Sequence, residues 1–370
     1  LVASQIVDDL KLWGDLSFLD AGMLKRGDPT SEGPAGLADK KNRGRSGSLA
    51  VSARAFASRS YYASMVYQFV SGAMAERRLR PLADSHLYHS PNFIMPHFDG
   101  AQVITIHDLS TIRFPQFHRK QMVVLCEGGI HSAIEGKVHV ITDSFHVRDE
   151  LVNDFGVENS RISTVHLAPD PRCRPRHESE CRHALDALGL SHKAFFLSVG
   201  TIEPRKNLLR VFEAFRTGRR AGHFDWPLIV VGASGWKSSR EHEMLDELIK
   251  EGLALYLDYV TDDTLLTLYA SAGALVFPSL YEGFGLPALE AAACGCPVIT
   301  SEHSAMAEFA PEQTLFVNPE DVSSMCDALK AIPSRSEFGS GFDVSTQAAA
   351  RTWVDVAQET SDVYRAALQG

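Results

Sequence analysis

Apolar runs and helical apolar stripes alternate along the second half of the chain. Short runs of consecutive apolar residues, as in 195–199, predict buried strands. Apolar residues three and four positions apart, as in 207–219, predict helices with one buried face. Strands that alternate with helices in this way predict a parallel sheet covered by helices on both faces. The elements expected in this half are strands at 195–199, 227–232, 256–260 and 274–278 and helices at 207–219 and 262–272.

The first half repeats the pattern, and its apolar runs end in polar residues. Strands are expected at 87–90, 103–107, 138–144 and 162–168. Parallel strands that end this way deliver polar side chains to one edge of a sheet, where a ligand can bind. Ser144 is expected to cap the helix that follows, and Gly156 to close it. Before Leu87 neither a first strand nor a glycine-rich loop is recognisable.

The chain is long enough for two hydrophobic cores, because 370 residues exceed one typical domain. The proline-rich stretch from Pro169 to Pro175 is typical of an interdomain linker. A last helix is expected at about 350–368, with Trp353, Val356, Val363 and Tyr364 at helical spacing. The predicted organisation is therefore an α/β protein with domains at 1–175 and 176–348 and a final helix at 349–370.

Composition narrows the class of protein. The chain is 45% hydrophobic and 22% charged, with a net charge of −10, which argues against nucleic acid as the main partner. No apolar run reaches membrane-spanning length and no signal peptide is visible, so a cytoplasmic protein is expected. The six cysteines are interpreted as reduced residues of the core.

The basic segment from Lys25 to about Arg59 has little apolar periodicity, which predicts a mobile loop. Two interpretations stay open. One is a solvated linker, and the other is a flap that meets an anionic lipid surface or a lipid-linked acceptor.

The run from Ser279 to Glu290 carries the clearest candidate chemistry. Gly283, Phe284 and Gly285 form a turn between a buried strand and a helix that is expected to start near Leu286 and Pro287. Glycines allow a close approach of the backbone, and the N–H groups at a helix start attract phosphates. Glu282, expected on an exposed loop, and Glu290, expected in the first helical turn, are acceptors suited to sugar and ribose hydroxyls.

A second phosphate-binding corner follows the strand at 195–199. Gly200 and Thr201 lead to Arg205 and Lys206 at the expected start of a helix, where cations oppose the helix dipole unless an anion binds there. This arrangement favours a diphosphate ligand.

The string from Glu282 to Ala291, followed by 293–299, resembles the retaining glycosyltransferases of family 4, which have the two-domain GT-B fold. The resemblance runs from about Leu87 to the C-terminus. It implies two Rossmann-like doubly wound sheets that face a cleft and a last helix that crosses back to the N-terminal domain. It also implies an acceptor site in the N-terminal domain and a nucleotide-sugar site in the C-terminal domain.

Residue roles follow from the same resemblance. Arg205 and Lys206 match the family's diphosphate-binding element, although Thr201 stands where many members carry another arginine. His107 and Asp108 match the family's His-Asp element. His107 is expected to contact the donor sugar near the reacting carbon. Asp108 is expected either to face the sugar as well or only to hold the loop. Tyr259 and Val260 match the segment that receives the nucleobase, with Asp258 in place of the usual glycine. The run Gly232–Trp236 resembles a mannosyltransferase-like subgroup and favours GDP-mannose as donor.

The implied activity is transfer of a hexose, with retention of configuration, to a glycan or lipid-linked acceptor in polysaccharide synthesis. Such relatives work at the inner membrane face, so peripheral membrane association is a further expectation. No Asp-x-Asp motif or ligand cluster calls for a metal ion, and no cofactor is expected beyond the donor. The alternatives are a UDP- or dTDP-sugar donor, a UDP-sugar epimerase, a phosphorylase or a non-catalytic binding protein. A dinucleotide-dependent oxidoreductase is opposed by the missing Gly-x-Gly-x-x-Gly motif.

Overall fold

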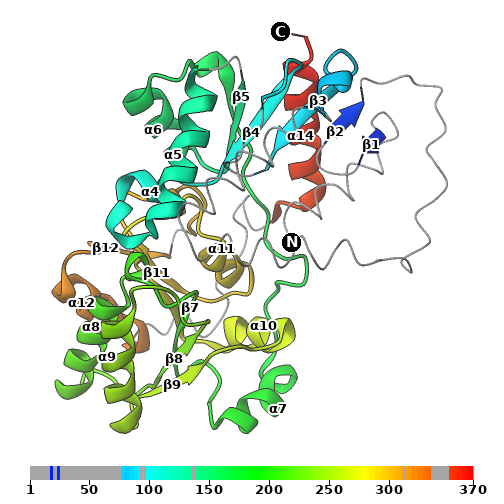
Figure 1. The fold of residues 1–370 in the computed structure, drawn as a ribbon. Coiled ribbons are helices and arrows are strands. Elements are labelled where there is room, and N and C mark those ends of the chain that lie inside the picture. Colours follow the sequence, from blue (N-terminus) through cyan, green and yellow to red (C-terminus); the bar gives the residue numbers. More distant parts are fainter. Residues whose placement is uncertain are drawn as a thin grey trace, which may run out of the picture.

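The computed structural model contains two six-stranded sheets, one above the other in Figure 1. It describes residues 17–19, 23–25, 77, 79–91, 93, 95, 97–135, 138–311, 313–334 and 350–369. The basic segment proposed as a flap lies outside the described residues apart from Lys25.

The first sheet has its strands in chain order. They are β1 (Ser17–Leu19), β2 (Met23–Lys25), β3 (His86–Ser90), β4 (Gln102–Ile106), β5 (His139–Thr142) and β6 (Ile162–Thr164). The strands β3 to β6 are parallel, whereas β1 and β2 form an antiparallel pair that adds to the edge of β3. The described strands of this sheet therefore show neither the doubly wound order nor the fully parallel pairing expected for it.

Helices α5 (Lys120–Glu135) and α6 (Phe145–Phe155) accompany this sheet, and a short turn of helix, α4 (Ser110–Arg113), follows β4. Val147 and Leu151 of α6 join Ile104 and Val140 in a buried cluster. The predicted caps of α6 are confirmed: the Ser144 hydroxyl accepts a hydrogen bond from the Val147 N–H, and Gly156 closes the helix in the left-handed conformation.

The second sheet is parallel throughout, in the order β12-β11-β10-β7-β8-β9. Because the chain builds outward from β7 in one direction and from β10 in the other, this sheet is doubly wound as expected. Its strands are β7 (Phe196–Val199), β8 (Leu228–Val231), β9 (Ala254–Leu257), β10 (Ala274–Phe277), β11 (Val298–Ser301) and β12 (Leu315–Val317).

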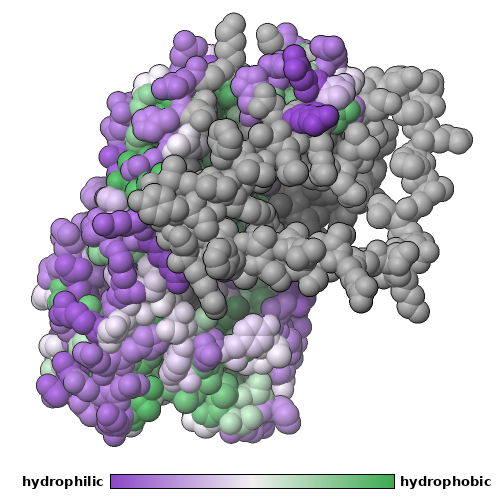
Figure 2. Space-filling view, in the orientation of Figure 1, coloured by the Kyte–Doolittle hydropathy of each residue, from purple (hydrophilic) through white to green (hydrophobic). Residues whose placement is uncertain are grey.

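Helices cover both faces of this sheet. Buried residues of α8 (Leu208–Arg220), α9 (Ser239–Lys250) and α12 (Val322–Ser334) form one core, and those of α7 (Glu178–Leu188), α10 (Asp262–Ser271) and α11 (Leu286–Ala293) form the other. The outer surface over α8, α9 and α12 is mostly hydrophilic, as amphipathic helices require (Figure 2). The helices α7, α9 and α12 are absent from the sequence predictions.

The last helix, α14 (Trp353–Ala367), lies beside β3 in Figure 1. Its residues Val356, Val363 and Tyr364 are buried against Leu87 and other residues of the first sheet. Arg351, just before the helix, donates a hydrogen bond to the carbonyl oxygen of His166. The predicted crossing of this helix back to the first sheet is confirmed.

Candidate active site

The turn from Glu282 to Gly285 joins β10 to α11 and lies against the first sheet. A Cβ atom at Gly283 would collide with the carbonyl oxygen of His107, and that carbonyl follows β4. The Ser144 hydroxyl donates a 2.6 Å hydrogen bond to the Gly283 carbonyl. Gly283 is therefore needed for the close approach of the first sheet, and the expected approach of a ligand stays a prediction. Gly285, at φ +100°, caps the start of α11.

Glu282 is at the centre of a buried ion cluster. Its carboxylate lies 2.7 Å from Lys206 Nζ and 3.0 Å from an Arg205 Nη, and its side chain is only 9% exposed. Burial works to raise the pKa of Glu282, but Lys206 and Arg205 outweigh it and lower that pKa to about 2. The expectation of an exposed loop carboxylate is wrong, because the two cations draw Glu282 inward.

Arg205 is shared between two carboxylates. It bonds Glu203 Oε1 at 2.7 Å as well as Glu282, and it donates to the carbonyl oxygen of Tyr281. Burial would lower the pKa of Arg205, but Glu282 and Glu203 raise it. The short 3₁₀ turn η4 (Pro204–Lys206) thus presents two cations that are already held in place. The charge of the predicted anion corner is thus balanced by carboxylates of the chain itself, and its binding of a diphosphate stays a prediction.

Gly200 and Thr201 line the same corner. Gly200 has φ +137° and lies against the Lys206 side chain, and Thr201 packs beside Gly235 of the neighbouring loop. None of the described residues accepts a hydrogen bond from the N–H of Phe284 or of Gly285. These two N–H groups differ in this from Arg205 and Lys206, which are paired with carboxylates. Leu286 follows as the first residue of α11 and is half-buried.

His107 lies just beyond β4 and is paired through both ring nitrogens. Nδ1 is 2.6 Å from an Asp143 carboxylate oxygen, and Nε2 is 3.0 Å from the Pro91 carbonyl oxygen. Burial opposes a charge on the ring, but the Asp143 carboxylate outweighs it and raises the pKa of His107 to about 9. Two acceptors require two N–H donors, so His107 is an imidazolium at neutral pH.

Asp143 is a site residue that the sequence predictions missed. It follows β5, which is the neighbour of β4, so the ends of the two strands meet at one edge of the sheet. The sequence signal that could have found it is a carboxylate at the end of a predicted strand. Asp108, in contrast, accepts hydrogen bonds from the Ser110 N–H and hydroxyl and so holds its own loop.

Glu290 lies in the second turn of α11 rather than in the first, because the helix begins at Leu286. Burial raises the pKa of Glu290 to about 7, although the Tyr269 hydroxyl lowers it. The group is therefore only partly ionised near neutral pH.

The segment predicted to receive the nucleobase lies on a loop and is partly exposed. Strand β9 covers 254–257 instead of the expected 256–260, so Tyr259 and Val260 lie on the loop that follows it. Tyr259 is 86% exposed. The structure does not bring this side chain together with the buried cluster.

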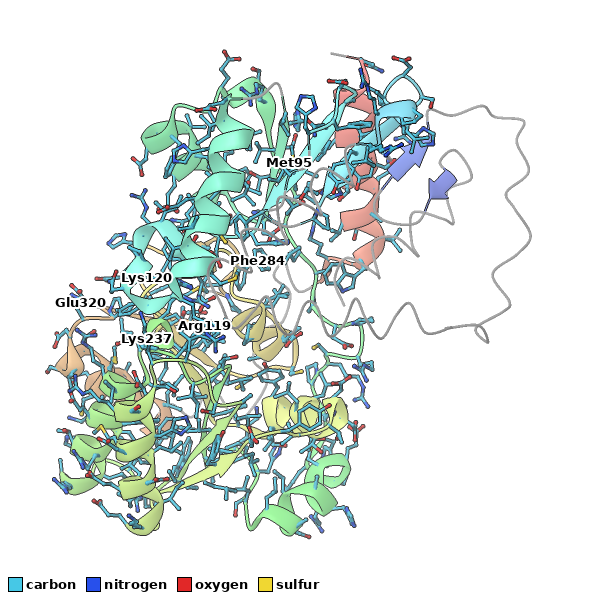
Figure 3. All side chains as sticks on the ribbon, viewed as in Figure 1. Met95, Arg119, Lys120, Lys237, Phe284 and Glu320 are labelled. Atoms are coloured by element: carbon cyan, nitrogen blue, oxygen red, sulfur yellow. The ribbon has the colours of Figure 1, made fainter. Side chains whose placement is uncertain are left out.

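Trp236 and Lys237 connect the two halves of the molecule, the one with the first sheet and the one with the second. Trp236 Nε1 donates a 2.5 Å hydrogen bond to the Phe117 carbonyl, and Lys237 Nζ donates to the carbonyls of Gln116 and His118. Figure 3 shows Lys237 close to Arg119 at the junction of the halves, with Phe284 lying between the two sheets. The Gly232–Trp236 motif thus ends in a contact between the halves.

Within the described ranges, no group of three or more His, Cys, Asp or Glu side chains could hold a metal ion. A membrane-spanning helix is also absent from this part of the chain, since none of its helices is both long and apolar enough. All six cysteines are free thiols.

Comparison with known proteins identifies the family. The model of the glycosyl transferases group 1 matches residues 186–338. O-antigen chain mannosyltransferase B of Escherichia coli is 31% identical over 371 residues, which cover 99% of this chain and 92% of that protein. The chain belongs to the group 1 glycosyl transferases. A second relative of this glycosyltransferase, O-antigen chain mannosyltransferase RfbU of Salmonella typhimurium, is 28% identical over 65% of the chain and 64% of its own length.

Solved structures agree on the fold. Sucrose-phosphate synthase from Thermosynechococcus elongatus matches this glycosyltransferase with a TM-score of 0.60 and 21% identity, over 76% of this chain and 73% of that one. WaaG, a glycosyltransferase involved in lipopolysaccharide biosynthesis, matches with a TM-score of 0.56 and 16% identity, over 75% and 76%. The predicted GT-B fold is confirmed.

Proposed function

We propose that this glycosyltransferase moves mannose from GDP-mannose to a glycan or lipid-linked acceptor in polysaccharide synthesis, with retention of configuration and without a metal ion or other cofactor. The observation that carries the proposal is the buried cluster of Arg205, Lys206 and Glu282, whose neighbour Gly283 lies against the backbone of the charged His107. The nearly full-length similarity to an O-antigen mannosyltransferase supports mannose as the sugar.

The chemistry follows from where charge develops. When the bond between the anomeric carbon and the diphosphate breaks, negative charge grows on the departing diphosphate. Arg205, Lys206 and the N–H groups of Phe284 and Gly285 are positioned to stabilise that charge. Once the diphosphate has replaced Glu282 at the two cations, these groups need to move little during the reaction itself.

The remaining groups suit the sugar and the ribose. A diphosphate that binds Lys206 and Arg205 competes with Glu282 for them, which frees its carboxylate to accept hydrogen bonds from hydroxyls of the transferred sugar. His107 Nε2 would donate to a hydroxyl near the reacting carbon in place of the Pro91 carbonyl oxygen, to which it is bonded in the free protein. Glu290 would accept from the ribose, and Tyr259 would stack on the nucleobase. No nucleophile is assigned to the protein.

A UDP- or dTDP-sugar donor is the second candidate. It is kept because the exposed Asp258, beside the residues proposed to receive the base, stands where glycine is usual in the family, so the base preference of the family does not carry over at this position. Work at the inner face of the cytoplasmic membrane belongs to the same proposal, since a lipid-linked acceptor would be held there.

A panel of nucleotides tests the donor. The melting temperature is measured with excess GDP, UDP, dTDP, ADP and NAD, because a ligand that binds only the folded protein raises it. A rise with GDP alone is the expected result. A rise with UDP or dTDP alone would replace the donor, and a rise only with NAD would contradict the whole proposal.

A further inference from the structure

A short chain of hydrogen bonds joins the last helix to the first sheet. The Tyr364 hydroxyl of α14 lies 2.6 Å from His89 Nδ1, and His89 Nε2 lies 2.9 Å from the Thr105 hydroxyl. The Tyr364 and His89 rings meet edge to face, with centroids 5.4 Å apart. Thus a residue 275 positions away in the sequence fixes the ring of His89.

His89 is connected to His107 in two ways, through its hydrogen-bond partner Thr105 and through the backbone that leads to Pro91. Thr105 lies on β4, two residues before His107. Pro91 follows β3, two residues after His89, and its carbonyl accepts the hydrogen bond from His107 Nε2. The His89 ring therefore ties together the strand that carries His107 and the strand end that supplies one of its partners.

The two histidines carry different charges. Burial and, to a smaller extent, the nearby His107 lower the pKa of His89 to about 3, so His89 is neutral. A neutral imidazole has one donor and one acceptor nitrogen, and hydroxyls can play either role, so both bonds of His89 are satisfied. The charged groups that face His107 are Asp143 from the end of β5 and Asp108 from its own loop.

We infer that Tyr364 and His89 are positioning residues, which hold Pro91 and Thr105 and thereby fix the orientation of the His107 ring toward the donor sugar. The last helix then does more than cover the first sheet: it sets the geometry of the reacting site. The kinetic part of this inference rests on the proposed function, whereas the structural part does not.

The Tyr364→Phe variant tests the inference because it removes one hydroxyl and keeps the packing. The His107 pKa is measured by NMR titration of labelled histidines, with His107→Asn used to assign the resonance. The bond to Pro91 helps to raise the pKa of His107, so a displaced Pro91 should lower it. The expected result is a His107 pKa below that of the unmodified protein. The alkaline limb of the transfer rate should move to lower pH, and kcat should fall about tenfold at unchanged donor KM.

Two controls separate positioning from stability. Tyr88→Phe removes a hydroxyl from the neighbouring residue of the same strand, and Val363→Ala trims a buried side chain of α14 outside the hydrogen-bond chain. Neither should change the His107 pKa, although Val363→Ala should lower the melting temperature. Thr105→Val cuts the other end of the chain and should lower the His107 pKa in the same direction, which keeps the test available if Tyr364→Phe does not fold.

An unchanged His107 pKa in both Tyr364→Phe and Thr105→Val would overturn the inference, as would an equal shift in Val363→Ala. The titration needs no donor. The inference can therefore fail while mannosyl transfer is established, and it can hold if the donor is another sugar nucleotide.

Discussion

The two sheet edges that meet at the site hold their charges differently. At the second sheet, Arg205 and Lys206 are each 13% exposed and are neutralised by Glu203 and Glu282. At the first sheet, His107 is 42% exposed and has Asp143 as its single directly paired carboxylate. The side proposed to bind the phosphates is therefore buried and internally paired in the free protein, whereas the side proposed to face the sugar is accessible.

Removing Glu282 should have the largest effect, on both the stability and the activity of the protein. Glu282→Ala leaves Lys206 without its paired carboxylate and Arg205 with one, so we expect a loss of about 3 kcal/mol in the free energy of unfolding. Transfer should be abolished as well, because the variant lacks the acceptor for the sugar hydroxyls. Denaturant unfolding and a transfer assay measure the two effects.

Glu302→Ala is the matched control, because Glu302 is an exposed carboxylate just after β11 and should matter little to either quantity. Near-normal turnover by Glu282→Ala would remove Glu282 from the site, and normal stability would contradict the buried cluster.

Lys206 should separate diphosphate binding from nucleoside binding. Lys206→Ala removes a charged donor, so GDP affinity should fall about tenfold or more while guanosine affinity changes little. Calorimetric titration measures both ligands, and Lys250→Ala, at an exposed position of α9, serves as the control. Equal losses for GDP and guanosine would mean that Lys206 does not meet the phosphates.

Glu290 should give the smallest effect, a dependence of donor affinity on pH. Its pKa is raised to about 7 in the free protein, and a carboxylate must be ionised to act only as an acceptor. Affinity for GDP-mannose should therefore increase about threefold between pH 6.5 and 7.5, as expected for one linked proton.

The same raised pKa has a consequence for stability. Because the folded-state pKa lies above the usual value for a carboxyl, the stability that protonated Glu290 contributes is present below about pH 4.5 and is lost as pH rises through about 7.

In Glu290→Gln the pH dependence of donor affinity should disappear. Its persistence in that variant would assign the linked proton to another group.

Local signals made much of the fold predictable. The caps Ser144 and Gly156 set the ends of α6, and the apolar run of β7 was recognised within one residue. The helix α10 was also expected within one residue of its true end. Each of these elements depends on neighbouring residues, which a sequence displays directly.

The site was predictable in its residue types and not in its pairings. Glu282 and Lys206 are 76 positions apart and His107 and Asp143 are 36 apart, so their contacts exist only after the strands are arranged. The same reason explains why Glu282 was expected to be exposed. The loop carrying Tyr259 was misjudged because β9 ends earlier than its apolar pattern suggests.

Mannosyl transfer with retention is tested most directly by incubating the protein with GDP-mannose and mannose-terminated glycans. GDP release is measured, and the anomeric configuration of the product is determined by NMR. We expect a mannosylated product with the same α configuration as the donor, formed in the presence of a metal chelator. A β-linked product, or turnover of UDP-sugars alone, would contradict it.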